Sequence, residues 1–185
     1  MQAERWPIRK IAGYLALITA SHLSAVSPSP QVIPQTQGTA LTGAFVTFPR
    51  AGSKKPIVLV LSFSHKATGD VTAWNKHFEA DYTSGLIDYY ELADFQGVPS
   101  WIMKMILHGM RRSVQEPEQS HLIPFFSGED EWKGLVGYSS PSIAYVVMAD
   151  GTGRIVSQTH GPASVAKAAD LDAIIAKLNS AGQGK

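Results

Sequence analysis

The clearest pattern in the chain is a continuous run of apolar and β-branched side chains at residues 57–63, IVLVLSF. A run of this kind is typical of a strand that other elements cover on both faces. After a polar loop, apolar residues recur at helical spacing, at Val71, Trp74 and Phe78. Asp70 stands where a side chain often caps the first turn of a helix. The pattern therefore predicts a buried strand, a loop and a helix.

A second strand and a second helix are predicted next. Residues 86–92, LIDYYEL, have the aromatic and β-branched content of a strand. Pro99 follows at a position where the first turn of a helix tolerates proline. We expect this helix to continue to about Arg112.

The last part of the chain predicts a β-hairpin and a helix. Residues 142–148, SIAYVVM, indicate a strand, and the sequence ADGTG at 149–153 favours a turn. Residues 154–158 would be the partner strand. A final amphipathic helix is expected over 162–178. Its apolar face should comprise Val165, Leu171, Ile174, Ile175 and Leu178.

The N-terminal pattern differs from the rest. Residues 1–25 combine a basic start with the apolar stretch IAGYLALITA at 11–20, which predicts a signal peptide or an uncleaved membrane anchor. We expect the protein to be exported to a bacterial periplasm, either free or tethered to the membrane. A mitochondrial presequence is the alternative, because such leaders are also basic, although they are amphipathic. The basic residues are Arg5, Arg9 and Lys10.

The remaining chain divides into a linker, one domain and a tail. Residues 26–40 are rich in Pro, Ser and Gln, which is typical of a linker. We expect the domain over 41–180 and a short tail over 181–185. With 185 residues and 44% hydrophobic composition, one well-buried core is the expectation.

Composition narrows the function classes. A formal net charge of +1 gives no basic excess, so nucleic acid is not an expected partner. The chain has no cysteine, which excludes disulfides, thiolate nucleophiles and cysteine-ligated metals. None of its six histidines forms an i, i+4 pair, so we expect neither a metal nor another cofactor.

The element order is that of the thioredoxin-like fold, an α/β fold with a central mixed sheet and flanking helices. Pro141 precedes a strand, where proteins of this fold carry a cis-proline. In redox-active members a Cys-x-x-Cys would fall on residues 68–71, which here read Thr-Gly-Asp-Val. A threonine hydroxyl cannot cycle between oxidised and reduced forms. The chain should therefore be redox-inactive.

Residues 101–118, WIMKMILHGMRRSVQEPE, carry a more specific resemblance. They resemble the helix and the basic-acidic tail of the mitochondrial ATP synthase assembly factor family (ATP-ten). The resemblance covers roughly residues 41–178. It implies a cysteine-free assembly factor that helps a hydrophobic Fo subunit join the ATP synthase, rather than an enzyme. The match continues through Gly137, Tyr145, Asp150, Ile155 and Gly161.

The first candidate site is the former active-site groove, which we expect to hold an extended peptide. Its residues are His65, Thr68, Asp70 and Pro141. A structural alternative is that Asp70 only caps a helix and His65 is a solvated loop residue. A functional alternative is a peroxiredoxin-like or hydrolytic enzyme that uses His65, Thr68 and Asp70.

The second candidate site is the apolar and basic helix. Methionine side chains suit surfaces that adapt to varied apolar partners, and the arginines could contact anionic lipid headgroups. The alternatives are a helix packed in the core and arginines that form ion pairs with nearby glutamates. The expected partner is a protein or peptide client, such as a membrane-protein subunit. The site residues are Trp101, Met105, Met110, Arg111 and Arg112.

Overall fold

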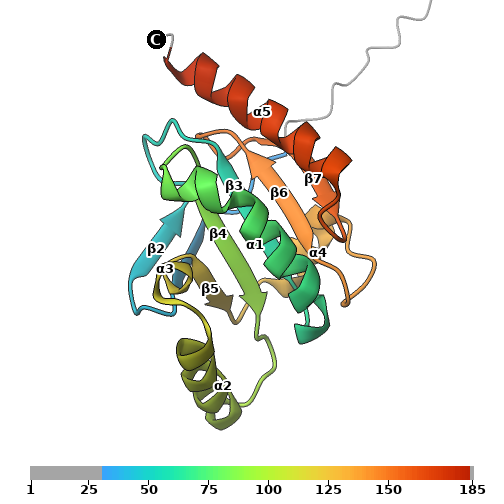
Figure 1. The fold of residues 1–185 in the computed structure, drawn as a ribbon. Coiled ribbons are helices and arrows are strands. Elements are labelled where there is room, and N and C mark those ends of the chain that lie inside the picture. The colour runs from blue at the N-terminus through green and yellow to red at the C-terminus, as the bar shows by residue number, and fades with distance from the viewer. Residues whose placement is uncertain (1–30, 184–185) are drawn as a thin grey trace, which may run out of the picture.

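The computed structural model describes residues 31–183, and a mixed five-stranded sheet lies at their centre (Figure 1). The apolar run forms β3 (Ile57–Ser62), whose residues 57–61 are fully buried. Strand β4 (Asp88–Asp94) pairs with it in parallel, and β6 (Tyr145–Ala149) pairs on its other side in antiparallel register. Because consecutive side chains of β3 point to opposite faces and all five are buried, the strand is covered on both faces, as its unbroken apolar pattern predicted.

The two edge strands complete the order β5-β4-β3-β6-β7. Strand β7 (Ile155–His160) forms the predicted hairpin with β6. Strand β5 (Leu122–Phe125) pairs in parallel with β4 and was not predicted. It contains Pro124, which a sheet tolerates at an edge because one side of that strand makes no ladder.

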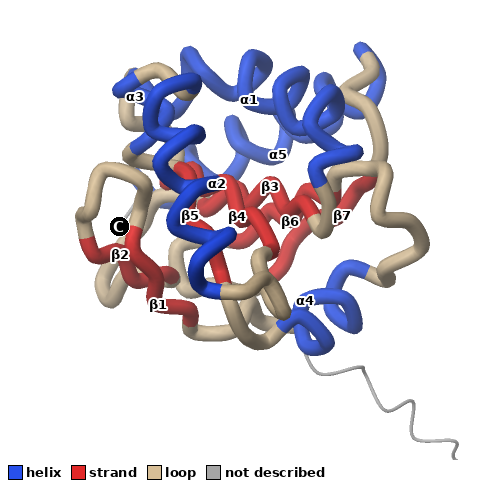
Figure 2. Tube along the Cα trace, turned by 90° about the horizontal axis from the view of Figure 1, so that it is seen from below, coloured by secondary structure: helices blue, strands red, loops and turns tan. Residues whose placement is uncertain are grey.

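Helices cover the sheet unequally (Figure 2). Helices α1 (Thr68–Thr83) and α5 (Val165–Gln183) lie on one face, where Val58 and Val60 point. Helix α4 (Glu129–Val136) lies toward the other face, where its Trp132 joins the core. Val165 is 89% exposed, so the expected apolar face of α5 was wrong at its first member.

The folded part begins earlier than the linker prediction allowed. Strands β1 (Thr36–Thr39) and β2 (Phe45–Phe48) form an antiparallel two-stranded sheet, and Ile33 is buried. The assigned linker, 26–40, therefore contains a strand. Its pattern was missed because β1 is short and polar. The predicted leader, residues 1–25, lies outside the described residues.

Helix α2 (Ser100–Ser113) projects beyond the carboxyl end of β4, and the short α3 (Glu116–Gln119) follows it (Figure 1). None of the side chains of α2 is buried. The alternative of a core helix is therefore wrong. The long chain segment that carries the specific resemblance is instead a half-covered lobe at one end of the sheet.

The cis-proline expectation is also wrong. The cis peptide bond found among residues 31–183 joins Phe48 and Pro49, and Pro141 follows a trans bond. Ala144, directly before β6, uses both backbone groups internally: its N–H donates to Asp70 (3.2 Å) and its oxygen accepts from Gly161 (2.8 Å).

Candidate functional site

A cavity of about 600 Å³ lies between the start of α1, the carboxyl ends of β3 and β4, and the inner side of α2. Its volume falls within the range of about 300–1,000 Å³ that is usual for ligand pockets. In Figure 1 this is the region where α1, β4 and α2 converge. Carboxyl ends of strands are also the usual place for ligands in α/β sheets.

The cavity joins the two candidate sites in part. His65 and Thr68 line it from the former active-site loop, and Met110 lines it from α2. The other predicted site residues do not line it. These are Asp70, Pro141, Trp101, Met105, Arg111 and Arg112.

The side-chain arrangement that the enzyme alternative requires is not formed. The Thr68 hydroxyl donates to the backbone oxygen of His65 at 2.6 Å. The Asp70 carboxylate accepts the N–H of Ala144 instead of capping α1, whose N-cap is Ala67. Within residues 31–183 no hydrogen bond links the His65 imidazole to either side chain. A general base must reach the proton that it removes, so the geometry gives the enzyme alternative no support.

Pro141 lies in a loop that is already occupied by internal hydrogen bonds. The Tyr145 hydroxyl accepts the N–H groups of Ser139 and Ser140, at 2.9 and 2.8 Å, and donates to the Ser140 oxygen. The bonds that the hydroxyl shares with the Ser139 side chain and accepts from the two N–H groups lower the pKa of Tyr145, although burial, the largest single influence, opposes them. The segment therefore has few backbone groups left for pairing with an extended peptide.

One side of the cavity is apolar. The residues at the base of α2, including Met110 and Val114, pack against a small cluster of Leu41, Ala93 and Leu122. Phe95, between β4 and α2, belongs to the same cluster. The apolar wall thus comes from α2 and the strand ends together. Its lining residues are Phe63, Val71, Phe95, Val98, Ile106, Met110, Val114 and Leu122.

The cavity is also lined by Glu91, which was not predicted from the sequence. Asn75 of α1 donates to a Glu91 oxygen at 2.8 Å and accepts the Tyr89 hydroxyl. Burial, as the largest cause, raises the pKa of Glu91, while the bond from Asn75 lowers it and Glu118 raises it further. The available sign in the sequence was a lone carboxylate inside an aromatic strand, LIDYYEL.

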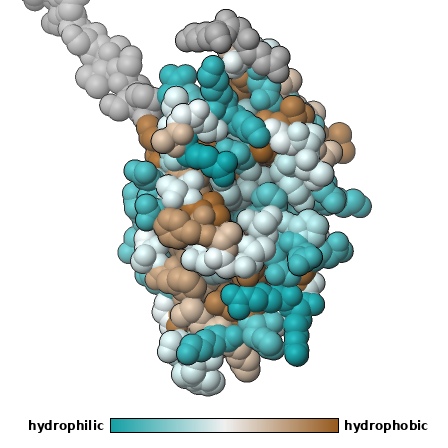
Figure 3. Space-filling model, turned by 90° about the vertical axis from the view of Figure 1, so that its left-hand side faces the viewer, coloured by the Kyte–Doolittle hydropathy of each residue, from teal (hydrophilic) through white to brown (hydrophobic). Residues whose placement is uncertain are grey.

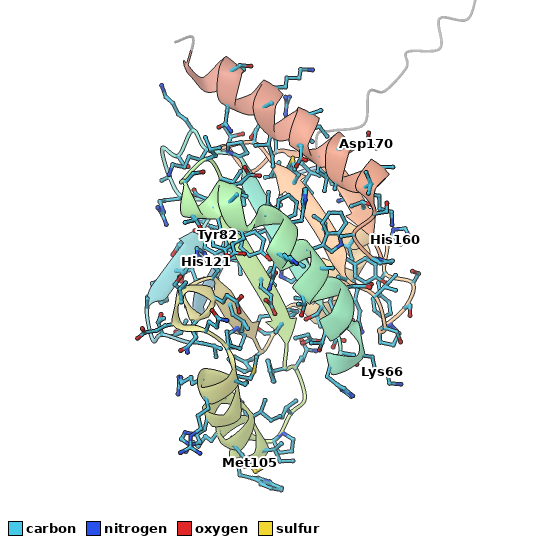
Figure 4. All side chains as sticks on the ribbon, in the orientation of Figure 1. Lys66, Tyr82, Met105, His121, His160 and Asp170 are labelled. Carbon is cyan, nitrogen blue, oxygen red and sulfur yellow. The ribbon has the colours of Figure 1, made fainter. Side chains whose placement is uncertain are left out.

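Two aromatic side chains lie next to the hydrogen-bonded residues Tyr89, Asn75 and Glu91. Tyr82 of α1 and His121, just before β5, lie side by side in Figure 4, with ring centres 4.6 Å apart. His121 Nδ1 lies 3.1 Å from the backbone oxygen of Tyr89. Burial lowers the pKa of His121. Contacts from α1, from β4 and from the loop before β5 therefore fix the hydrogen-bonded row of Tyr89, Asn75 and Glu91.

A second carboxylate, that of Asp94, also lines the cavity. The pKa of Asp94 is raised to about 6, by burial first and then by the neighbouring Glu129, against the N–H of Gln96 and the charge of Lys133. Lys133 forms an ion pair with Glu129. With Glu91 and Glu118, Asp94 gives the cavity three carboxylates among its polar lining residues.

The outer side of α2 is exposed. Trp101 is 70% and Met105 64% exposed, and Figure 4 shows Met105 on the part of α2 farthest from the sheet. Arg111 donates through Nε to the Leu41 oxygen at 2.8 Å. In the part of the chain that the structure describes, neither arginine pairs with Glu116 or Glu118. Figure 3 shows apolar patches among hydrophilic side chains on the adjoining surface.

Residues 31–183 contain no group of three or more His, Asp or Glu side chains placed to hold a metal ion. None of the helices in this range has both the length and the apolar content needed to cross a bilayer.

Comparison with known proteins places the fold. No protein-family model matches the chain, and no curated protein does. Among solved structures, a thioredoxin-family thiol:disulfide interchange protein from Chlorobium tepidum is 13% identical, with a TM-score of 0.51 over 83% of this chain and 99% of the other. The exposed lipoprotein thioredoxin Etrx1 from Streptococcus pneumoniae is 14% identical, with a TM-score of 0.52 over 80% and 99%.

A third similar structure is BsSco, a member of the Sco family of cytochrome c oxidase assembly proteins. It is 10% identical, with a TM-score of 0.55 over 86% of this chain and 98% of its own. At these identities the similarity establishes the fold alone. Because the chain has no cysteine, it lacks the side chains that the thiol chemistry named for these similar proteins requires. The chain has a thioredoxin-like fold without redox thiols.

Proposed function

We propose that this protein is a redox-inactive binding protein that holds an apolar segment of a partner protein in the cavity between α1 and α2. The observation that carries the proposal is that His65, Thr68 and Met110 line one cavity of about 600 Å³. The former active-site loop and the methionine-containing helix therefore contribute to one site. Without thiols, that site offers binding surface and not disulfide exchange.

The apolar wall supports an apolar occupant. Ile106 and Met110 of α2 are only partly covered, and both line the cavity. A methionine side chain adapts its shape to different apolar partners. Burying such side chains against a ligand yields roughly 25 cal/mol per Å² of apolar surface.

The finer proposal is an assembly factor for a hydrophobic membrane-protein subunit, such as one in the Fo sector of the ATP synthase. The resemblance of residues 101–118 supports it, and those residues form α2 and its tail. BsSco, which shares the fold, belongs to a family of cytochrome c oxidase assembly proteins. Export to the periplasm is part of the proposal, and Etrx1 is an exposed lipoprotein of the same fold.

Site-specific photo-crosslinking in living cells tests this function. A photoreactive amino acid at position 68 or 110 should capture the same membrane-protein subunit, identified by mass spectrometry. The matched control is position 170, because Asp170 is exposed on α5 (Figure 4). A purified peptide from the captured subunit should then compete for the crosslink. Equal capture from position 170, or no capture from 68 and 110, would contradict the proposal.

A further inference from the structure

The charges around the cavity are one-sided. Three carboxylates line it, those of Glu91, Asp94 and Glu118. No lysine or arginine is among its lining residues, and His65 is the single side chain there that can become cationic. Arg111, which lies on the same helix as the apolar wall, is directed to the Leu41 oxygen. No lysine or arginine side chain lines the cavity beside these carboxylates, and Lys133, whose charge acts on Asp94, is paired with Glu129.

Of the three carboxylates, Glu91 is the one best placed to bind a ligand cation. Asn75 holds one of its oxygens, and within residues 31–183 no protein donor contacts the other. A half-buried carboxylate without a cation bears a desolvation cost, which is the reason that burial raises its pKa. A ligand cation that reaches Glu91 would offset that cost.

The surroundings of Glu91 define the rest of the ligand. The same cavity is lined by the aliphatic side chains of Ile106 and Val114 and by the thioether of Met110. An unbranched aliphatic stem can lie along such a wall while its charged end reaches a polar partner. A ligand that uses both features must therefore carry the aliphatic stem and the positive charge on the same side chain or molecule.

We propose that the cavity binds an aliphatic chain that ends in a primary ammonium group, with Glu91 as the counter-ion and the inner side of α2 as the apolar contact. The inference rests on the proposed function, in which this group is a lysine side chain within the apolar client segment. A free aliphatic amine has the same chemistry. The experiment below separates the two sources.

The test uses the purified chain and three probes, with affinity measured by isothermal titration calorimetry at neutral pH. The probes are the peptide acetyl-LLAKALL-amide, the same peptide with norleucine in place of lysine, and hexylamine. We expect the lysine peptide to bind about tenfold more tightly than the norleucine peptide, as a charge-assisted hydrogen bond implies. Hexylamine should bind more weakly than the peptide but measurably.

Variants locate the effect. Glu91→Gln should reduce the preference for lysine to less than about threefold, because the amide has no charge. Glu131→Gln, which alters an exposed carboxylate on α4, should leave the preference unchanged. Met110→Lys supplies a resident cation to the cavity and should also abolish the preference. This second variant tests the site independently of any change that Glu91→Gln makes to folding.

The outcomes separate the two proposals. Equal binding of the lysine and norleucine peptides would overturn the ammonium inference and leave the proposed function standing. Binding of hexylamine without either peptide would support the ammonium site and contradict the holding of a segment. If no probe binds, or if Glu91→Gln keeps the full preference, the inference is wrong.

Discussion

At the scale of single residues, two side chains changed their roles between sequence and structure. Asp70 was expected to cap a helix or to serve a site, and it instead fixes the backbone of Ala144 before β6. Glu91 was one letter within a strand, and it becomes the polar group at the cavity wall. In both cases the partner is distant in sequence, so no local pattern could reveal it.

The raised pKa of Asp94 predicts a pH dependence of stability. The folded state holds this proton up to about pH 6, whereas the ordinary pKa is 3.8. The folded state therefore binds more protons between these values, and this group's contribution to stability is lost as pH rises from 3.8 to about 6. Asp94→Asn should flatten that part of the profile, because the amide does not titrate.

Urea unfolding of both proteins at pH 4.5 and pH 7 checks this prediction. Asparagine keeps an oxygen for the N–H of Gln96, which now donates to Asp94 at 2.8 Å. The difference in stability between the variant and the parent should therefore be more favourable to the variant at pH 7 than at pH 4.5. The same difference between the two pH values in both proteins would contradict the assignment.

Gly151, in the hairpin turn between β6 and β7, is predicted to be intolerant of a side chain. An added Cβ would lie 2.5 Å from the Ser53 oxygen and 2.8 Å from backbone atoms of Lys54. Because these are backbone atoms, the clash cannot be relieved by a rotamer change, and Gly151→Ala should destabilise by about 1–3 kcal/mol. The control is Gly109→Ala, where no atom lies within 4 Å.

Thermal unfolding by circular dichroism compares these two variants. Gly109 lies inside α2, so alanine there should raise the helix propensity by about 0.5–1 kcal/mol. We expect Tm to fall for Gly151→Ala and to stay or rise for Gly109→Ala. A parent-like Tm for Gly151→Ala would show that the turn can move aside.

At the scale of elements, α1 and α2 differ in what stabilises them. Phe78 of α1 is fully buried in a core cluster that also contains residues of the sheet and of α5, whereas Trp101 of α2 is 70% exposed. Phe78→Ala should cost about 3–5 kcal/mol through loss of burial and a cavity, and Trp101→Ala less than about 0.5 kcal/mol. Chemical denaturation measures both. A large loss for Trp101→Ala would mean that α2 packs more tightly than the structure shows.

At the scale of the whole molecule, the cavity exists because three parts of the chain meet. Residues from α1, from β4 and from α2 all line it. Only the inner side of α2 takes part, which separates two methionines that looked equivalent in sequence. Met110 lines the cavity, and Met105 lies outside it, 64% exposed.

Paired methionine variants test this separation. Met110→Ala should weaken binding of the lysine peptide about three- to tenfold, because it removes apolar contact from the wall. Met105→Ala should leave that affinity within about twofold. Titration calorimetry measures both. Equal losses would show that the peptide contacts the outer side of α2.

Much of the fold could be predicted from the sequence. The buried β3, the helix α1, the strand β4 and the β6–β7 hairpin follow from hydrophobic period and turn residues, which are local properties. Strands β1 and β5 were missed, because one is short and polar and the other contains Pro124 at a sheet edge. Helix α4 is only eight residues long and was missed as well.

The sequence by itself determined the order of the main elements and the absence of thiol chemistry, since periodicity and composition need no knowledge of neighbours. Only the tertiary structure decided which side of α2 faces the cavity and that Glu91 lines the same cavity. The physical reason is that these contacts join residues far apart in the chain. Their meeting depends on strand order and on the path of loops, which local patterns do not encode.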